Sequence, residues 1–263
     1  MTNTTISLAL SSTGFKFPTH VGVLQAIKEH DIDVVEISGS SGGALIGGLF
    51  SCGMSISELK AWSVNTNWVK FFRSGLLSGG LVSLDKFEGH LLELTSGKVL
   101  GEVPNLHITA CDINKHSLEV LNSESYPEMT VAKAIRASIS IPGVFTPVRH
   151  EEKTLLDGAI MNTLPLNLLK KDVDIKAGVR ITYSDEHPVP DTSSIAVIAR
   201  RSLYMIVDRG NAWALPREGC HVIDIDTGFA DGLDVFMSKK KRRLLISTGH
   251  ADLCTFLESN IHQ

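Results

Sequence analysis

The chain has 263 residues, enough for one sizeable α/β domain but few for two full ones. It is 43% hydrophobic and 21% charged, as an ordinary globular protein is, and its formal net charge of −4 argues against a nucleic-acid partner. The four cysteines are widely spaced and form no CxxC pair, which predicts reduced thiols in a cytoplasmic compartment and no zinc or other metal site.

The sequence carries no recognisable targeting signal or internal boundary. No basic residue precedes the first apolar run, so we expect no secretory signal. No repeat, low-complexity stretch or hinge divides the chain, and we expect a single domain over residues 1–263. The longest uncharged stretch, residues 37–57, is interrupted by six glycines, which favours a buried helix packed closely on a sheet over a membrane span.

The first elements alternate between strand and helix patterns. Pro18 suits the first turn of a helix, and Val21, Leu24 and Ile27 then recur at helical spacing. The predicted elements in order are a strand over 6–10, a turn-rich loop over 11–17, a helix from Pro18, a strand over 34–38 and an apolar helix over 44–50. This order predicts an α/β fold with a parallel sheet covered by helices.

The same alternation continues along the rest of the chain. Ser55 and Glu58 have the spacing of a capping box, which begins a helix running to about Asn65. The further predicted elements are a helix over 86–94, strands over 106–112 and 118–121, a helix over 130–138, strands over 153–156 and 176–183, a helix over 194–211, a strand over 221–226 and a final helix over 238–259.

A serine-centred turn separates the second strand from the second helix. Residues Gly39-Ser40-Ser41-Gly42-Gly43 read G-x-S-x-G between two apolar runs. A serine at such a bend projects its hydroxyl out of the sheet, so Ser41 is a candidate nucleophile, with Gly39, Gly42 and Gly43 as the glycines of its elbow. From this stretch alone, a plain Ser/Gly-rich turn is an equal alternative, and the lack of a following lysine argues against a P-loop.

A nucleophilic serine needs a base, and the chain offers ten histidines and several carboxylates. His221 begins a predicted strand and His250 lies inside the last predicted helix, which favours structural roles for both. Asp157 ends a short apolar run and precedes Gly158 and Ala159, so it can approach the serine closely, and burial would raise its pKa toward neutrality. Taken alone, the Asp-Gly pair favours a simple turn.

Four blocks in order resemble the patatin-like phospholipase family. They are residues 8–24, the serine elbow over 39–43, a serine/proline segment over 137–148, and the Asp-Gly-Ala segment from 157 with Asn162 and Pro165 behind it. Together they span nearly the first two thirds of the chain. The resemblance implies a three-layer α/β/α fold, in which the mainly parallel sheet is flanked by helices on both faces.

The resemblance also implies a chemistry. Ser41 is the nucleophile and Asp157 the base of a Ser-Asp dyad without histidine, and Gly158 and Ala159 belong to the aspartate motif. The implied reaction is hydrolysis of fatty acyl esters of phospholipids or lysophospholipids through an acyl-serine intermediate, with no cofactor. Two alternatives stay open, namely an acyltransferase or thioesterase that uses the same serine, and a weakly active lipid-binding protein.

The loop expected to form the oxyanion hole departs from the family's pattern. Ser12, Thr13, Gly14 and Phe15 stand where the family usually has G-G-G-x-R/K-G, and only Gly14 and Lys16 match. None of these residues is proline, so every backbone N–H donor exists, but non-glycine residues reach positive φ less readily. We expect lower activity or an unusual substrate, because losing one oxyanion donor costs on the order of 3 kcal/mol.

Two segments bear on membrane contact. Residues 67–82 place large apolar side chains among glycines and serines, and indicate either a loop packed on the core or a mobile apolar flap over a lipid site. The basic run 239–243 opens the last helix, and indicates either a solvated face or a contact with anionic headgroups. We therefore expect a cytoplasmic protein, with a peripheral membrane contact left open.

Overall fold

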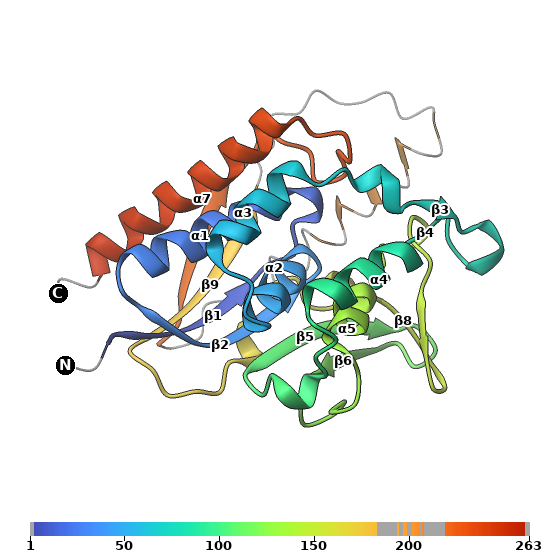
Figure 1. Cartoon of the computed structure of the whole chain (residues 1–263), viewed down its shortest axis with the longest axis horizontal. Coiled ribbons are helices and arrows are strands. Elements are labelled where there is room, and N and C mark those ends of the chain that lie inside the picture. The colour runs from blue at the N-terminus through green and yellow to red at the C-terminus, as the bar shows by residue number, and fades with distance from the viewer. Residues whose placement is uncertain are drawn as a thin grey trace.

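The computed structural model describes residues 3–182, 194, 197–198, 201–202, 204–205, 207 and 219–260 (Figure 1). At its centre is an eight-stranded sheet. Its strands are β1 (Thr5–Leu10), β2 (Asp33–Ser40), β5 (Leu106–Asp112), β6 (Ser117–Leu121), β7 (Val148–His150), β8 (Lys153–Asp157), β9 (Ile175–Thr182) and β10 (His221–Asp226).

The sheet is mainly parallel, as predicted. Strands β10, β9, β1, β2 and β5 pair in that order and all run the same way. Strands β6 and β8 join β5 antiparallel, and β7 joins β8 antiparallel. Because parallel strands are buried on both faces, β1 is apolar along most of its length, and its side chains from Ile6 to Leu10 are all buried.

Helices cover one face of this sheet. They are α1 (Pro18–Glu29), α2 (Gly42–Ser51), α3 (Ile56–Asn65), α4 (Asp85–Leu94), α5 (Val131–Ser138) and α7 (Lys239–Asn260). Helix α7 packs along α1, and α2 lies over β2 and β5 (Figure 1). This layer and the sheet share the main hydrophobic core, to which Ile6, Leu8 and Leu10 of β1 contribute.

The opposite face carries a thinner layer in the described residues. It contains the short 3-10 helix η6 (Leu166–Leu168), and Leu164 and Leu166 pack there on Ala9 of β1. The 3-10 helix η5 (Gly158–Ile160) directly follows β8. The predicted three-layer α/β/α architecture is confirmed. The helix expected over 194–211 lies largely outside the described residues.

Local sequence signals account for several helix boundaries. Pro18 occupies the first turn of α1. The Ser55 hydroxyl accepts the Glu58 N–H at the start of α3, and the Glu58 carboxylate accepts the Ser55 N–H, as the capping box predicts. The uncharged stretch 37–57 forms the end of β2, the buried helix α2 and the start of α3. In the described chain, no helix combines the length and the apolar character needed to cross a membrane.

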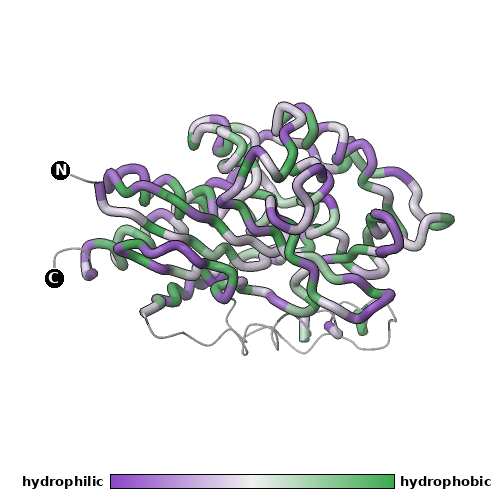
Figure 2. The backbone as a smooth tube through the Cα atoms, turned by 90° about the horizontal axis from the view of Figure 1, so that it is seen from below, coloured by the Kyte–Doolittle hydropathy of each residue, from purple (hydrophilic) through white to green (hydrophobic). Residues whose placement is uncertain are grey.

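Residues 67–82 combine a packed base with a projecting tip. The segment holds η2 (Trp68–Phe71), β3 (Arg73–Ser74), η3 (Leu76–Ser78) and β4 (Val82–Ser83); the remaining 3-10 helices are η1 (Gly14–Lys16) and η4 (Leu100–Glu102). Trp68 and Phe71 are buried in the core, whereas Leu76, Leu77 and Leu81 are exposed. The first half of the segment therefore packs on the core, and its tip is an exposed apolar projection (Figures 1 and 2). The mobile flap over a lipid site stays a prediction.

Candidate active site

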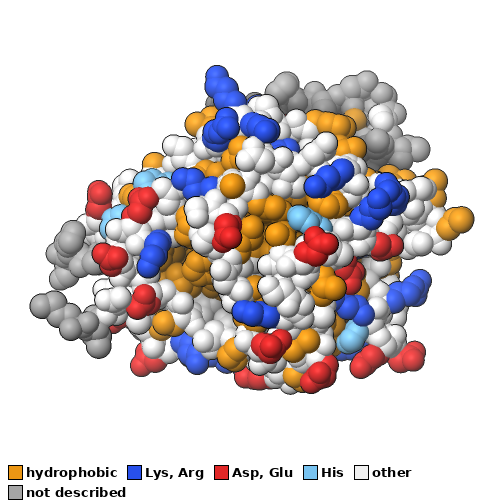
Figure 3. Space-filling view, viewed as in Figure 1, with side chains coloured by type: hydrophobic (Ala, Val, Ile, Leu, Met, Phe, Trp, Pro, Cys, Tyr) orange, Lys and Arg blue, Asp and Glu red, His pale blue; other side chains and the backbone are white. Residues whose placement is uncertain are grey.

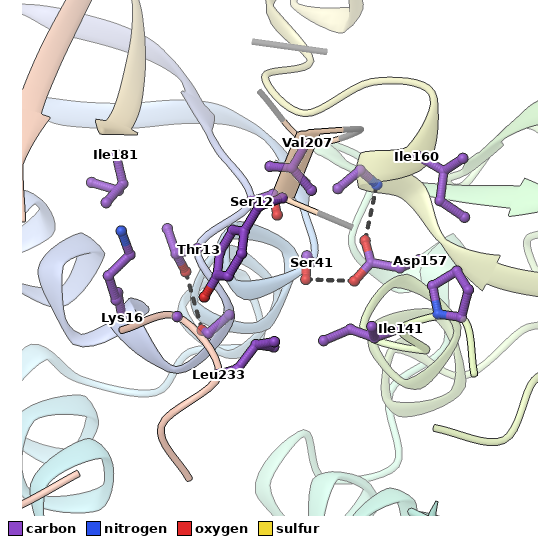
Figure 4. A pocket seen from close by; sticks show the side chains of 15 residues that line it. Ser12, Thr13, Lys16, Ser41, Ile141, Asp157, Ile160, Ile181, Val207 and Leu233 are labelled. Atoms are coloured by element: carbon purple, nitrogen blue, oxygen red, sulfur yellow. Dashed lines mark hydrogen bonds between the residues drawn. The ribbon is translucent and has the colours of Figure 1, made fainter. Parts of the chain in front are cut away.

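Sheet pairing brings Ser41 and Asp157 together across 116 residues of sequence. Strand β2 pairs with β5 up to Ser40, opposite Thr109, and β8 pairs with the same edge of β5 up to Asp157, opposite the next residue, Ala110. The two strands run toward each other, so their ends meet. The Ser41 hydroxyl donates a hydrogen bond of 2.7 Å to Oδ2 of Asp157 (Figure 4).

Ser41 sits on a sharp elbow between β2 and α2. Its φ of 51° and ψ of −118° lie in a region that residues other than glycine rarely adopt. Its backbone N–H donates to the Ser138 hydroxyl at 2.8 Å, which holds the strained turn in place. A Cβ on Gly43 would lie 2.2 Å from the Leu10 carbonyl oxygen, so the elbow needs glycine there to pack against β1.

Asp157 is a buried carboxylate with few hydrogen-bond donors. It is 4% exposed, and its Oδ1 accepts the Ala159 N–H at 2.9 Å. Burial raises the pKa of Asp157 to about 7, although the Ala159 N–H and the Ser41 hydroxyl act in the opposite direction. At neutral pH the carboxylate is therefore a useful proton acceptor for the hydroxyl that it contacts.

The histidines lie elsewhere in the described structure. His221 is exposed on β10 with its ring against Phe256, and His250 on α7 lies 2.6 Å from Glu29. His20 is buried near the loop over 12–15, with Nε2 2.9 Å from the Ser11 carbonyl oxygen. Because burial lowers the pKa of His20 to about 4, its neutral ring donates to that carbonyl and supports the loop.

The loop predicted to form the oxyanion hole lies beside Ser41. Ser12, Thr13 and Gly14 line one pocket at the serine, and Phe15 lines another. The Ser12 and Phe15 N–H groups donate to carbonyls of other segments, at 2.9 and 2.8 Å. The N–H groups of Thr13 and Gly14 have no hydrogen-bond partner within the described part of the chain. Gly14 has a φ of +55°, so the glycine that matches the family stands where glycine is needed.

Ser41 lies between two pockets of different character. The first, of about 680 Å³ including open solvent, is lined by the loop over 12–14, Asp157, Ile160 and Leu233 among others (Figure 4). The second, of about 510 Å³ on the same measure, is almost wholly apolar. It is walled by seven aromatic side chains: Phe15, Phe17, Trp68, Phe71, Phe72, Phe87 and Phe145.

Two residues of α5 that sequence reasoning missed position this site. Ser138 accepts the Ser41 N–H, and Arg136 is a buried cation, 1% exposed. The Arg136 guanidinium donates to the Ser140 hydroxyl and to both the carbonyl and the hydroxyl of Thr146, which fastens the loop that lines both pockets. An arginine on the apolar face of a helix was the available signal, since a buried charge needs partners.

No metal site accompanies these residues in the described part of the chain. No group of three or more histidines, cysteines, aspartates or glutamates is placed there to hold an ion. The arrangement offers a hydroxyl, a carboxylate and backbone N–H donors, with Lys16 in the wall of the first pocket.

The fold and the serine elbow define an α/β protein with a paired serine and aspartate at the edge of its sheet. The family model for patatin-like phospholipase matches residues 8–170, and the chain belongs to that family. An uncharacterised NTE family protein of Mycobacterium bovis is 28% identical over 192 residues, which cover 71% of this chain and 51% of that protein. The lysophospholipase NTE1 of Mycosarcoma maydis is 25% identical over 224 residues, covering 80% of this chain and 11% of that protein.

Solved structures share the fold at low sequence identity. VipD from Legionella pneumophila superposes with a TM-score of 0.65 at 14% identity, covering 98% of this chain and 67% of that one. A chain of the ExoU–SpcU complex from Pseudomonas aeruginosa gives a TM-score of 0.54 at 16% identity, covering 99% and 52%. The chain spans about half the length of the first curated relatives it matches.

Proposed function

We propose that the protein hydrolyses fatty acyl esters of phospholipids or lysophospholipids, with Ser41 as nucleophile and Asp157 as general base. The observation that carries the proposal is the 2.7 Å hydrogen bond from the Ser41 hydroxyl to a carboxylate that burial holds near neutral pKa. Membership of the patatin-like phospholipase family and similarity to a lysophospholipase support the lipid substrate.

The first half of the reaction forms an acyl-serine. The Ser41 Oγ attacks the ester carbonyl carbon while Asp157 accepts its proton. The carbonyl oxygen becomes an oxyanion that the N–H groups of Thr13 and Gly14 stabilise. As the tetrahedral intermediate collapses, the carbon–oxygen bond to the alcohol breaks, and protonated Asp157 gives its proton to the departing oxygen.

The second half releases the fatty acid. Water attacks the acyl-serine carbonyl carbon and passes a proton to Asp157, and the bond to the Ser41 Oγ then breaks as the oxygen recovers that proton. The dyad therefore returns to its starting state, and one water is consumed in each turnover.

The two pockets at Ser41 suit the two sides of an acyl ester. The aromatic pocket offers an apolar, concave surface for a fatty acyl chain, in which burial of each CH₂ contributes about 0.8 kcal/mol. The first pocket is more polar at its serine end, where Ser12 and Thr13 lie, and would receive the glycerol side of the ester. We expect a cytoplasmic protein that associates with membranes peripherally.

Product analysis tests the proposal. Purified protein is incubated with a defined phospholipid or lysophospholipid, and released fatty acid is measured by mass spectrometry. We expect Ser41→Ala and Asp157→Asn each to lower the rate at least about a thousandfold, because each removes one half of a coupled pair. The control His250→Asn changes an exposed ion pair far from the site and should keep wild-type activity.

Reaction with a fluorophosphonate, which labels an activated serine, gives a readout independent of the lipid. Full activity or labelling in Asp157→Asn would overturn the dyad. Labelling of Ser41 without release of fatty acid, together with transfer from acyl-CoA to an alcohol, would instead assign an acyltransferase.

A further inference from the structure

The projection formed by β3 and β4 exposes three leucines. Leu76 and Leu81 are 69% and 60% exposed and Leu77 is fully exposed, and the tip is hydrophobic in Figure 2. In Figure 1 this ribbon extends beyond the body of the molecule at the right. Large apolar side chains gathered on one projection indicate a surface that another phase or molecule covers, since single exposed leucines are normally scattered.

The base of the projection is anchored, so the leucines are held outward. The Val82 N–H donates to the Val144 carbonyl and the Thr146 N–H donates to the Val82 carbonyl, each at 2.9 Å. Gly80 packs so closely that a Cβ there would lie 2.6 Å from the backbone of Phe145. The ribbon thus continues the loop that lines the aromatic pocket, and its tip reaches away from it.

The sequence around the ribbon is basic although the chain as a whole is acidic. Residues 59–84 contain Lys60, Lys70 and Arg73 and no aspartate or glutamate, whereas the formal net charge of the chain is −4. Lys70 and Arg73 are exposed on the segment that leads into the ribbon. Exposed cations near an apolar tip complement a membrane surface, in which anionic headgroups cover an apolar interior.

The basic run at the start of α7 contacts the residues just before this segment. Arg242 is 8% exposed, and its guanidinium donates to the Thr66 carbonyl at 2.7 Å, which docks the start of α7 against residues that lead into 67–82. Lys239, Lys240 and Lys241 are exposed beside that joint. Figure 3 shows basic side chains along the upper margin and hydrophobic ones at the right-hand tip.

We propose that Leu76, Leu77 and Leu81, together with Lys239–Lys241, form a docking rim for an anionic lipid surface. The leucines enter the lipid interface and the lysines rest on phosphate-bearing headgroups. The inference rests on the proposed function, because the segment that carries the leucines also walls the aromatic pocket with Trp68 and Phe71. Docking through this rim brings the segment that walls the aromatic pocket to a lipid surface.

Vesicle flotation tests the docking rim without hydrolysis. The Ser41→Ala protein is mixed with vesicles of phosphatidylcholine, or of phosphatidylcholine and phosphatidylglycerol in equal parts, at low and high salt. We expect binding to the anionic vesicles that weakens with salt. Adding Leu76→Ser and Leu77→Ser should weaken this binding at least about tenfold. Changing the three lysines to glutamine should weaken it roughly tenfold and remove its dependence on salt.

Leu92→Ser is the matched control. Leu92 is a 43% exposed leucine on α4, and its change should leave vesicle binding as in the parent. Binding of the double leucine variant as tight as the parent's, or an equal loss in Leu92→Ser, overturns the docking rim. The docking rim is also overturned if the Ser41→Ala protein binds another protein through this surface and binds neither kind of vesicle.

A second measurement separates this proposal from the proposed function. With Ser41 intact, the double leucine variant should react with a soluble fluorophosphonate at the wild-type rate, because its changed side chains are fully outside the pockets. Vesicle binding without any labelling of Ser41 would contradict the proposed hydrolase and support the docking rim. Normal labelling without vesicle binding would do the reverse.

Discussion

At the scale of single residues, the pKa values of two buried carboxylates of this chain are shifted in opposite directions. Asp157 and Glu36 are 4% and 2% exposed, and burial by itself raises the pKa of both. Glu36 accepts hydrogen bonds from Ser7, from His107 and from two backbone N–H groups, which together bring its pKa to about 2. Asp157 accepts only two, so its pKa stays near 7. At Glu36 the donors outweigh burial, whereas at Asp157 burial outweighs the two donors.

The pKa of Asp157 sets the expected pH dependence of activity. The base must be ionised, so kcat/KM for a soluble ester should rise with pH through about 7 and level off above it. At pH 6 the rate should be about a tenth of the plateau. Initial rates between pH 5.5 and 9, at a temperature where the protein stays folded, check this. A profile that is flat down to pH 5.5 would show that another group is the base.

Ionisation of Asp157 should also lower the free energy of unfolding. In the unfolded chain the carboxyl loses its proton near pH 3.8, but in the folded chain it keeps it to about 7, so ionisation opposes folding increasingly between these values. Asp157→Asn removes that penalty, and we expect the free energy of unfolding at pH 8 to rise by up to about 4 kcal/mol. Urea titrations should show almost no gain at pH 4. An equal gain at both pH values would contradict the assigned ionisation.

At the scale of elements, the site exists because β2 and β8 end against adjacent residues of β5. The approach of β8 is close, since a Cβ on Gly158 would lie 2.4 Å from the Thr109 carbonyl oxygen. Helix α5 supports the site: its Ser138 accepts the Ser41 N–H, and its Arg136 donates to the Thr146 carbonyl in the loop that follows the helix. The geometry of the Ser41–Asp157 pair therefore depends on four elements, β2, β5, β8 and α5.

Replacing Gly158 should separate the dyad more than it unfolds the protein. In Gly158→Ala the new methyl pushes the end of β8 away from β5 and moves Asp157 from Ser41, so we expect at least about a hundredfold loss of kcat. The overpacking should also cost about 1 to 3 kcal/mol of stability. Gly89→Ala is the control, because nothing lies within 4 Å of its added methyl on α4, and it should be fully active. Wild-type kcat in Gly158→Ala would show that the close approach is not needed.

At the scale of the whole molecule, Glu36 ties together segments that are far apart in sequence. Its carboxylate connects β2 to Ser7 of β1, to His107 of β5 and to the backbone of Lys170 and Lys171, which follow η6 on the opposite face. This network lies in the first half of β1, β2 and β5, whereas Ser41 follows the last residue of β2. It anchors the second layer to the sheet.

Glu36→Gln should therefore weaken folding without changing the chemistry. A neutral amide accepts fewer of these hydrogen bonds, and we expect a loss of about 2 to 4 kcal/mol at pH 7. The folded pKa lies below the unfolded one, so the contribution is complete above about pH 4.5 and is lost as pH falls toward 2. Unfolding titrations at pH 7 and pH 3 should show the difference shrinking in acid. A loss of equal size at both pH values would contradict a role for the carboxylate charge.

Local patterns in the sequence determined most of the elements of this protein. Alternating apolar runs, Pro18, the capping box at Ser55 and the glycines around Ser41 act over a few neighbouring residues, so their effects can be read along the chain. The four family-like blocks added the pairing of Ser41 with Asp157, which stays a functional prediction until the variants are measured. The single-domain organisation over residues 1–263 also stays a prediction.

Only the tertiary structure decided how these elements meet. The shared edge of β5, the aromatic pocket built from segments 15–17, 68–87 and 145, and the outward tip of residues 76–81 all depend on contacts between distant parts of the chain. The supports from Arg136 and Ser138 and the differing acidity of the two carboxylates do so as well. Burial and hydrogen bonding are properties of an environment, and this environment forms only when the chain has folded.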